Sequence, residues 1–255
     1  MFAKKSLGQH FLRSERALNT IIEAGKLTQE DAVLEIGPGE GVLTTKLLER
    51  AGHVIAVEKD DHLYEELRGK FKNEKLELIH GDVLDLNIET FKNYKLVANI
   101  PYNITGAILE KFLSADTQPT LIVLLVQKEV AERIVARDKK ESILSISVKA
   151  YGTPHYVEKV LAGSFAPAPK VDSAIIAIED ISKKFFEKFS EREFFALLHA
   201  GFKSKRKKLS SNLASLYGKE KVSETFKYLN LNDNIRAEDV AIGEWGRIAE
   251  ALAQH

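Results

Sequence analysis

Apolar positions in the first half of the chain follow two alternating spacings. Short apolar runs predict buried strands, and stretches with apolar residues three or four positions apart predict amphipathic helices. The expected strands are 33–36, 54–57, 76–79, 96–98 and 121–126, and the expected helices include 60–71, 104–113 and 128–137. Strands that alternate with helices predict a parallel sheet with right-handed connections and helices on both faces.

The pattern is different beyond the last of these helices. Segment 142–151 fits both periods, whereas 156–161 and 173–179 are typical of strands. The stretch 165–169 between these two strands contains two prolines, and the whole connection is too short for a helical crossover. We therefore expect an antiparallel hairpin at the edge of the sheet.

The C-terminal part of the chain is helical by its spacing. Its apolar residues recur three or four positions apart and form the expected core, with Phe194, Leu213 and Phe226 among them. Trp245 lies in an amphipathic segment and is expected in the same core. We therefore expect two domains, an α/β domain over residues 1–180 and a small all-helical domain over residues 181–255.

A glycine-rich loop follows the first of the predicted parallel strands. The strand 33–36 runs directly into Gly37, Gly39 and Gly41, after which the helical spacing begins. Glycines let a backbone approach a nucleotide closely. The spacing G-x-G-x-G differs from the dinucleotide pattern, and Glu35 and Glu40 disfavour a pyrophosphate. Such carboxylates suit a ligand with an ammonium and a sulfonium, so the loop predicts a site for S-adenosylmethionine.

Two further carboxylates follow the next two predicted strands. Glu58 comes twenty-one residues after Gly37, where an acidic side chain accepts hydrogen bonds from the hydroxyls of a ribose. Asp82 follows the strand 76–79 at the same edge of the sheet. An alternative for Asp82 is that it caps the following turn, because Asp after Gly is common there.

The four residues Asn99, Ile100, Pro101 and Tyr102 end the next strand, and they suit chemistry on an aromatic amine. Such an amine delocalises its lone pair into the ring and is a poor nucleophile unless acceptors hold its hydrogens. Asn99 offers a side-chain carbonyl, Pro101 stiffens the backbone so that the Ile100 carbonyl can face the same nitrogen, and Tyr102 offers a ring for stacking. The alternative is an ordinary proline-containing turn.

Composition excludes several classes of site. The chain has no cysteine and therefore neither disulfides nor thiolate metal ligands, which fits a cytoplasmic protein. Its seven histidines include no close pair with metal-ligand spacing, so we expect no metal. No apolar run approaches the length of a membrane span, and no apolar stretch follows Lys4 and Lys5, so we expect neither a membrane segment nor a secretory signal.

The net charge of zero hides an asymmetry along the chain. Residues 1–180 hold 23 Lys and Arg against 27 Asp and Glu, and residues 181–255 hold 14 against 10. The densest basic run consists of Lys203, Lys205, Arg206, Lys207 and Lys208. Cations in such a run bind nucleic-acid phosphates without regard to sequence, and the alternative is a solvated face.

Together these motifs resemble a known family, the rRNA adenine N6,N6-dimethyltransferases of the KsgA/RsmA branch. That branch modifies two adjacent adenines near the 3′ end of small-subunit rRNA. The resemblance covers nearly the whole chain and is carried by segments 4–12, 35–44, 99–102, 126–131, 165–174 and 202–213.

The resemblance implies a Rossmann-like class I methyltransferase sheet, and it favours a helix for 142–151. It also implies that small-subunit rRNA within a ribosomal particle is the partner of a monomeric enzyme. Asn99 would touch the target amine, with Tyr102 and Phe165 packing on a flipped adenine. Without the resemblance, Phe165 beside two prolines could be a simple plug, and only the resemblance favours the base contact. Cofactor contacts are implied for His10, Leu12, Gly37, Glu58, Asp82 and Asn99. Many relatives have Asn in place of His10, which still offers a polar ring nitrogen.

Two alternative functions remain open. The first is an Erm-type enzyme, which dimethylates an adenine of large-subunit rRNA. The segment 8–12 and the residues Arg236, Ala237 and Glu238 resemble the small-subunit branch more closely. The second is a mainly non-catalytic factor for ribosome assembly or nucleic-acid binding, against which the intact glycine loop and Asn99 argue.

Overall fold

The computed structural model describes residues 9–253, and its contacts divide the chain into two compact units. The first unit comprises the residues up to Ala131 together with Thr153–Ile181, and the second comprises Glu132–Gly152 and the residues from Ser182 onward. The second unit thus includes Glu132–Gly152, which lies within the range 1–180. The reason is that the helix Ile143–Lys149 packs against the helix Glu191–Gly201.

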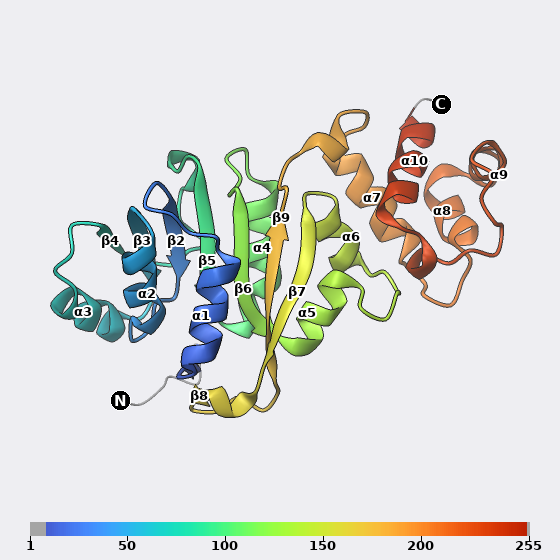
Figure 1. Ribbon diagram of the computed structural model, residues 1–255. Coiled ribbons are helices and arrows are strands. Elements are labelled where there is room, and N and C mark those ends of the chain that lie inside the picture. Colours follow the sequence, from blue (N-terminus) through green and yellow to red (C-terminus); the bar gives the residue numbers. More distant parts are fainter. Residues whose placement is uncertain (1–8, 254–255) are drawn as a thin grey trace. The chain divides into compact units, whose positions relative to one another are not determined.

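A seven-stranded sheet forms the centre of the first unit (Figure 1). Its strand order is β4-β3-β2-β5-β6-β9-β7. The first five strands in this order are parallel, and β9 runs antiparallel to both of its neighbours. The strands are β2 (Ala32–Ile36), β3 (His53–Glu58), β4 (Leu76–His80), β5 (Tyr94–Asn99), β6 (Leu121–Gln127), β7 (Thr153–Val160) and β9 (Ser173–Glu179). The chain order reverses between β2 and β5, and ligands of open α/β sheets bind at such a switch point.

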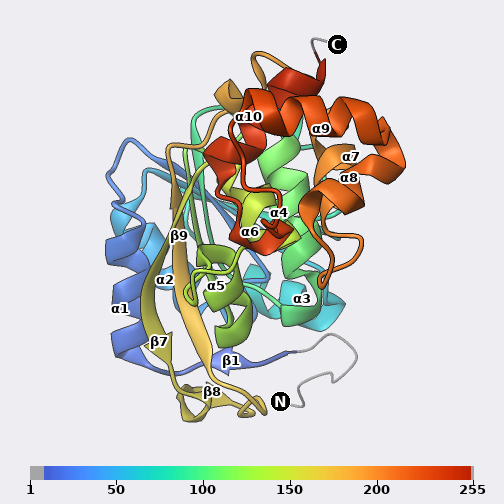
Figure 2. The same cartoon turned by 90° about the vertical axis from the view of Figure 1, so that its right-hand side faces the viewer.

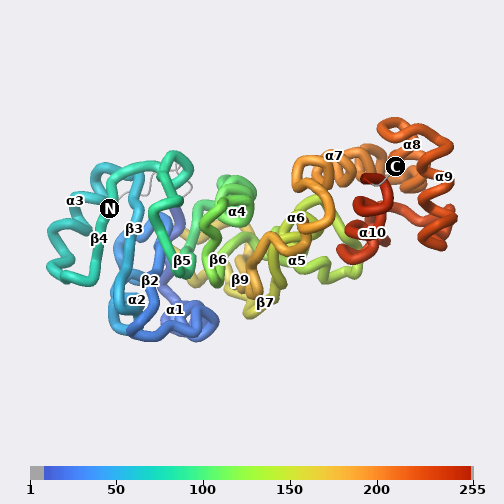
Figure 3. Tube along the Cα trace, turned by 90° about the horizontal axis from the view of Figure 1, so that it is seen from above, coloured from blue at the N-terminus to red at the C-terminus, as the bar shows by residue number. Residues whose placement is uncertain are grey.

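Helices cover both faces of this sheet. Helices α1 (Glu15–Ala24) and α2 (Val42–Arg50) lie on one face, and α4 (Thr105–Ser114) lies on the other (Figure 3). Helix α3 (Asp61–Lys70) connects β3 to β4. Side chains of α1, α2 and the inner strands form one core cluster, which contains Leu18, Leu47 and Val97. The expected parallel sheet with helices on both faces is confirmed.

The edge hairpin is also confirmed, with one difference in its first strand. β7 begins at Thr153, three residues before the expected start, and it includes Pro154. A proline lacks the N–H that a central strand needs, but β7 pairs only with β9 and can hold one. The predicted strand 156–161 was therefore too short at its N-terminal end.

Two helices within residues 128–149 refine the sequence-based ranges. The helix expected over 128–137 is α5 (Lys128–Val135), which ends earlier because Ala136 has a φ of 52°. The ambiguous segment 142–151 contains α6 (Ile143–Lys149), as the resemblance implied. Ser142 starts α6 because its side chain accepts a hydrogen bond from the Ser145 amide and the Ser145 side chain accepts one from the Ser142 amide.

The second unit is helical beyond residue 182 (Figure 2). It contains α7 (Glu191–Gly201), α8 (Leu209–Tyr217), α9 (Lys219–Tyr228) and α10 (Ile242–Ala253). Its core includes the fully buried side chains of Phe194, Leu213, Phe226 and Trp245. The core positions expected from helical spacing are therefore confirmed. No helix within residues 9–253 is long and apolar enough to cross a membrane.

A second, very small sheet joins two distant parts of the first unit. β1 (Phe11–Leu12) pairs antiparallel with β8 (Phe165–Ala166), and Figure 2 shows the two strands side by side. Leu12 lies opposite Phe165 in this ladder. The pairing attaches the N-terminal segment to the loop between β7 and β9.

Candidate active site

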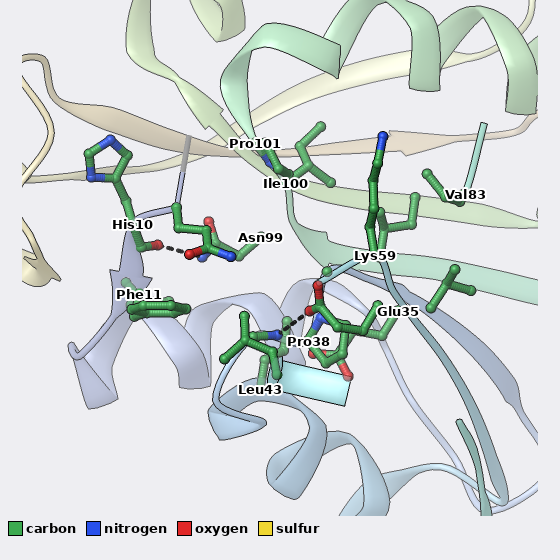
Figure 4. Close-up of a pocket in the computed structure, with 18 of the residues that line it drawn as sticks. His10, Phe11, Glu35, Pro38, Leu43, Lys59, Val83, Asn99, Ile100 and Pro101 are labelled. Atoms are coloured by element: carbon green, nitrogen blue, oxygen red, sulfur yellow. Dashed lines mark hydrogen bonds between the residues drawn. The ribbon is translucent and has the colours of Figure 1, made fainter. Parts of the chain in front are cut away.

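A pocket opens at the carboxyl ends of β2, β3, β4 and β5. The residues that line it come from the N-terminal segment, the glycine loop, the ends of β3 and β4, and the turn after β5 (Figure 4). This is the switch point of the strand order. The sequence-predicted residues that line the pocket are His10, Leu12, Gly37, Gly39, Glu58, Asp82, Asn99, Ile100, Pro101 and Tyr102.

The glycine loop connects β2 to α2 and lines the pocket with Gly37 and Gly39. Gly37, Gly39 and Gly41 have φ values of 64°, 60° and 75°, in the left-handed region that favours glycine. A Cβ on Gly41 would come within 2.5 Å of the Phe71 ring, so this glycine is also required by packing. A Cβ on Gly37 would meet no atom within 4 Å, which leaves the backbone at the pocket open to a ligand. Gly41 is not itself among the lining residues.

Glu58 ends β3 and is held by the backbone around it. Its Oε2 atom accepts a hydrogen bond from the Gly39 amide at 3.1 Å, and its Oε1 atom accepts one from the Asp60 amide at 2.8 Å. Burial raises the pKa of this carboxyl, and the backbone hydrogen bonds oppose that effect. The carboxylate is therefore fixed in orientation at the pocket, with lone pairs left to accept from a ligand.

Glu35 is completely buried in the wall of the pocket. Its Oε2 atom has no hydrogen-bond partner among the described residues. Burial raises the pKa of Glu35 to about 8, the Thr44 hydroxyl lowers it, and the neighbouring Glu58 carboxylate raises it. The side chain therefore carries a proton at neutral pH when the pocket holds no cation.

The negative charge of Glu40 is balanced by an ion pair. Both of its carboxylate oxygens pair with Arg13, at 2.8 Å (Nη2 to Oε1) and 2.6 Å (Nη1 to Oε2). The sequence suggested two negative charges near the loop, from Glu35 and Glu40. In the structure Arg13 balances the negative charge of Glu40, and burial favours the protonated form of Glu35. The Arg13 pair also ties the N-terminal segment to the glycine loop.

Asp82 lies just after β4, where it caps the following turn and lines the pocket. Its Oδ1 atom accepts a hydrogen bond from the Leu84 amide at 2.9 Å, which caps the turn. Its Oδ2 atom lies 2.6 Å from the Lys59 ammonium, and this hydrogen bond is the main reason that the pKa of Asp82 is lowered. Asp82 also lines the pocket, so a capping role and a ligand contact are compatible.

Asn99 ends β5 and points its side chain toward the N-terminal segment. The Asn99 Nδ2 atom donates to the His10 carbonyl oxygen at 3.3 Å. Because a carbonyl oxygen only accepts hydrogen bonds, this contact fixes the Asn99 amide with its nitrogen toward His10. The Oδ1 atom is then left as an acceptor in the pocket. Ile100 and Pro101 follow directly and line the same pocket.

Two aromatic rings border the site. The rings of His10 and Tyr102 stack with centroids 5.8 Å apart and an interplanar angle of 20°. The His10 Nδ1 atom lies 2.8 Å from the Pro167 carbonyl oxygen, so Nδ1 carries the proton of this hydrogen bond. Phe11 also lines the pocket, and the sequence did not predict it as a site residue. Its ring lies close to the glycine loop, 3.1 Å from where a Cβ on Gly39 would be.

Phe165 lies elsewhere. Its side chain is buried in the core cluster of the first unit, and it is not among the residues that line the pocket. In this conformation the ring presents no exposed face to a base. The observation agrees with the alternative of a plug beside two prolines, one of which, Pro169, is also buried.

The basic run lies in the second unit, in the loop between α7 and α8. Its five cations are all exposed, and within residues 9–253 none of them is seen in an ion pair. The buried Asn212 holds the loop, since its Nδ2 atom donates to the carbonyl oxygens of Gly201 at 2.6 Å and Ser204 at 3.1 Å. A small concavity is lined by Ser204, Lys205, Arg206 and Lys207. The loop is therefore anchored at Gly201 and Ser204 and exposes a positively charged surface.

The chemistry of the pocket fits S-adenosylmethionine. Gly37 leaves room for the ligand beside the backbone, and Glu58 presents a fixed carboxylate. The unpartnered Glu35 oxygen is a buried acceptor for which a cationic ligand is a suitable partner. In the described part of the chain, no three His, Cys, Asp or Glu side chains are grouped so as to hold a metal ion.

Comparisons with known proteins agree with this geometry. A family model described as "Ribosomal RNA adenine dimethylase" matches residues 2–254. The chain is 44% identical over 253 residues to Ribosomal RNA small subunit methyltransferase A of Dehalococcoides mccartyi, covering 96% of this chain and 87% of the relative. It is 38% identical over 265 residues to the protein of the same name from Nostoc sp., covering 98% and 97%.

Two solved structures are similar over nearly the whole chain. A dimethyladenosine transferase from Plasmodium falciparum has a TM-score of 0.82 and 29% identity, covering 94% of this chain and 96% of that chain. The 23S rRNA methyltransferase ErmE has a TM-score of 0.79 and 27% identity, covering 96% and 100%.

Proposed function

Because the chain belongs to the ribosomal RNA adenine dimethylase family, we propose that its pocket transfers methyl groups from S-adenosylmethionine to N6 of adenine in small-subunit rRNA. The chain is an rRNA methyltransferase. The targets that we propose are two adjacent adenines near the 3′ end of that RNA, each of which receives two methyl groups.

The orientation of Asn99 is the observation that carries this proposal. Its amide nitrogen donates to the His10 carbonyl, which leaves Oδ1 as an acceptor in the pocket that Asn99 lines. An adenine amine needs acceptors for its hydrogens before its nitrogen becomes nucleophilic. Asn99 Oδ1 and the Ile100 carbonyl are suitable acceptors, and the Tyr102 ring is a suitable surface for the base.

Direct transfer is the mechanism that these residues support. When bound, S-adenosylmethionine supplies a methyl group on a sulfonium that is already an excellent leaving group. The protein therefore has to align the amine with that methyl group and stabilise the positive charge that develops on nitrogen. Asn99 and Ile100 provide the stabilisation, and the proton of the amine leaves to solvent afterwards. No side chain is needed as a general base.

The cofactor contacts that we propose follow the ends of the strands. Glu58 accepts from the ribose hydroxyls, and Asp82 lies further along the same edge. Gly37 and Gly39 let the backbone approach the ligand. Gly41 is the N-cap residue of α2. His10 and Leu12 close the pocket from the N-terminal segment. The ammonium of the ligand is a partner for Glu35, whose pKa it would lower.

The RNA contacts that we propose come from both units. Adenine inside a helix cannot reach a pocket of this kind, so the target base must be unstacked. Tyr102 stacks on it, and a role for Phe165 requires its ring to leave the core. Lys203, Lys205, Arg206, Lys207 and Lys208 bind the RNA backbone. We expect a monomer that acts on a ribosomal particle, in the cytoplasm where bacterial rRNA is found.

Methyl transfer to isolated ribosomal subunits tests this function. Small and large subunits that lack the modification are incubated separately with the enzyme and tritiated S-adenosylmethionine. We expect label in small-subunit rRNA, as N6,N6-dimethyladenosine after digestion to nucleosides. Label in the large subunit alone would identify an Erm-type enzyme, which the similarity to ErmE keeps as the second candidate. Binding without any label would identify a non-catalytic factor.

A further inference from the structure

The hydroxyl of Tyr102 meets a side chain from a distant strand. Tyr102 Oη lies 2.7 Å from the Oγ atom of Ser173, seventy-one residues further along the chain. Either oxygen can donate in this hydrogen bond. The contact lies entirely within the first unit of the protein.

Ser173 is a rigid point of attachment. It is completely buried and is the first residue of β9. In the sheet it lies between Gln127 of β6 and Val160 of β7, so strand pairing fixes its backbone on both sides. A side chain at this position has little freedom to move.

Tyr102 itself belongs to a much less regular element. It begins a single turn of 3₁₀ helix that follows Pro101, between the end of β5 and the start of α4. A short connection of this kind does not by itself fix the plane of a ring. The orientation of the Tyr102 ring therefore depends on the contacts of its side chain.

Three contacts fix Tyr102. Its hydroxyl pairs with Ser173, its ring stacks on that of His10, and its carbonyl oxygen accepts a hydrogen bond from the Thr105 hydroxyl at 3.1 Å. The His10 ring lies against one face of Tyr102. Loss of the Ser173 contact would free the distal end of the ring while the other two contacts remain.

The Tyr102 hydroxyl acts through its position. Burial raises the pKa of Tyr102, and the Ser173 hydrogen bond only partly opposes that effect. The group therefore remains protonated at neutral pH and does not remove a proton from the target amine.

We propose that Ser173 is a positioning residue for methyl transfer, which holds the Tyr102 ring as the surface on which the target adenine stacks. This inference rests on the proposed function of the pocket. A base that stacks on a tilted ring would present its amine at the wrong angle to the methyl group, and transfer is sensitive to such displacements.

A double-mutant cycle tests this role. The variants are Ser173→Ala, Tyr102→Phe and the combination of both, assayed under single-turnover conditions with small subunits that lack the modification. Removing one neutral hydrogen bond is expected to slow transfer about 3- to 10-fold in each single variant. Because both changes remove the same contact, the double variant is expected to be no slower than the slower single variant.

Two further readouts separate positioning from loss of stability. The affinity for S-adenosylmethionine and the binding of the particle should stay unchanged, and the fraction of N6-monomethyladenosine should rise because the second transfer has to align a bulkier amine. Ser145→Ala is the matched control, since Ser145 is another completely buried serine whose hydroxyl makes structural hydrogen bonds in α6. This control should lower thermal stability and leave the product ratio unchanged.

Two results would overturn the inference. One is transfer at the wild-type rate by Ser173→Ala or by Tyr102→Phe, and the other is a double variant whose loss is the product of the two single losses. If Ser173→Ala does not fold, Tyr102→Phe alone decides the question, since it removes the same hydrogen bond from the other side. If the wild-type enzyme does not methylate adenine at all, the proposed function fails, and that outcome is distinct from any ratio between variants.

Discussion

The Oε2 atom of Glu58 accepts a hydrogen bond from the Gly39 amide at 3.1 Å. This contact joins the end of β3 to the loop after β2, so that the carboxylate and the glycine loop form one surface. The other carboxylate oxygen holds the Asp60 amide at 2.8 Å, at the start of α3. Glu58, which the sequence predicts as a ribose contact, therefore also holds the backbone of the pocket in place.

Glu58→Ala is expected to weaken binding of S-adenosylmethionine by about 1 to 3 kcal/mol, the usual range for leaving polar groups unpaired. Isothermal titration calorimetry measures this change. The melting temperature of the protein without ligand is the control, because loss of the Gly39 and Asp60 contacts also loosens the loop. Unchanged affinity would remove Glu58 from the cofactor site.

Glu35 predicts a dependence of stability on pH. Its pKa is about 8 in the folded protein against an ordinary value of 4.5, so the folded chain keeps a proton that the unfolded chain releases between these pH values. Glu35 is therefore most favourable to folding below pH 4.5. Above that pH its contribution to the free energy of unfolding falls by about 1.4 kcal/mol per pH unit, until the pH passes its pKa of about 8 in the folded protein.

Glu35→Gln should remove this part of the pH dependence. Denaturant unfolding of both proteins without ligand, at several pH values between 5 and 8, measures the effect. The difference in free energy of unfolding between variant and wild type should move in favour of the variant as the pH rises. Parallel curves for the two proteins would show that Glu35 is ionised in the fold.

The basic run between α7 and α8 predicts a dependence of RNA binding on salt. Changing Lys205, Arg206, Lys207 and Lys208 to Gln should weaken binding to the particle and flatten its salt dependence. For contacts of the single-stranded kind, the log-log slope should fall by about 0.7 per phosphate, hence by up to about 3 for four contacts. Filter binding at several salt concentrations measures the slope, and the affinity for S-adenosylmethionine should barely change.

A matched control separates this loop from net charge. Lys184, Lys219, Lys221 and Lys227 are four other lysines of the second unit, and their change to Gln removes the same total charge. If both quadruple variants lose the same slope, the loop has no special role. If neither loses any, RNA binds elsewhere, and Lys4 and Lys5 become the next candidates, although they lie outside the described residues.

The sequence was informative where a local pattern decides the structure. Glu58 and Asn99 were predicted because each directly follows a run of apolar residues, and the ends of parallel strands meet at one edge of a sheet. The glycine loop was predicted for the same reason. Glu58, Asn99, Gly37 and Gly39 do line one pocket in the structure, as the predicted topology requires.

The sequence was uninformative where contacts join distant segments. Nothing local indicates that β1 pairs with β8, which places Phe11 in the pocket and Phe165 in the core. The Arg13 pair that neutralises Glu40 depends on the same fold of the N-terminal segment. The contact between Tyr102 and Ser173 likewise requires β9 to be inserted beside β6.

Asn99 offers the sharpest test of the proposed chemistry, because methyl transfer by this pocket depends on the Asn99 carbonyl oxygen. The measurement is the single-turnover rate of methyl transfer to small subunits by Asn99→Ala and by the wild-type enzyme, with binding of the particle recorded in parallel. We expect a rate at least about 100-fold lower, comparable to the loss of one preorganised polar contact in a transition state, with binding retained. Transfer by Asn99→Ala at close to the wild-type rate would contradict the proposed mechanism.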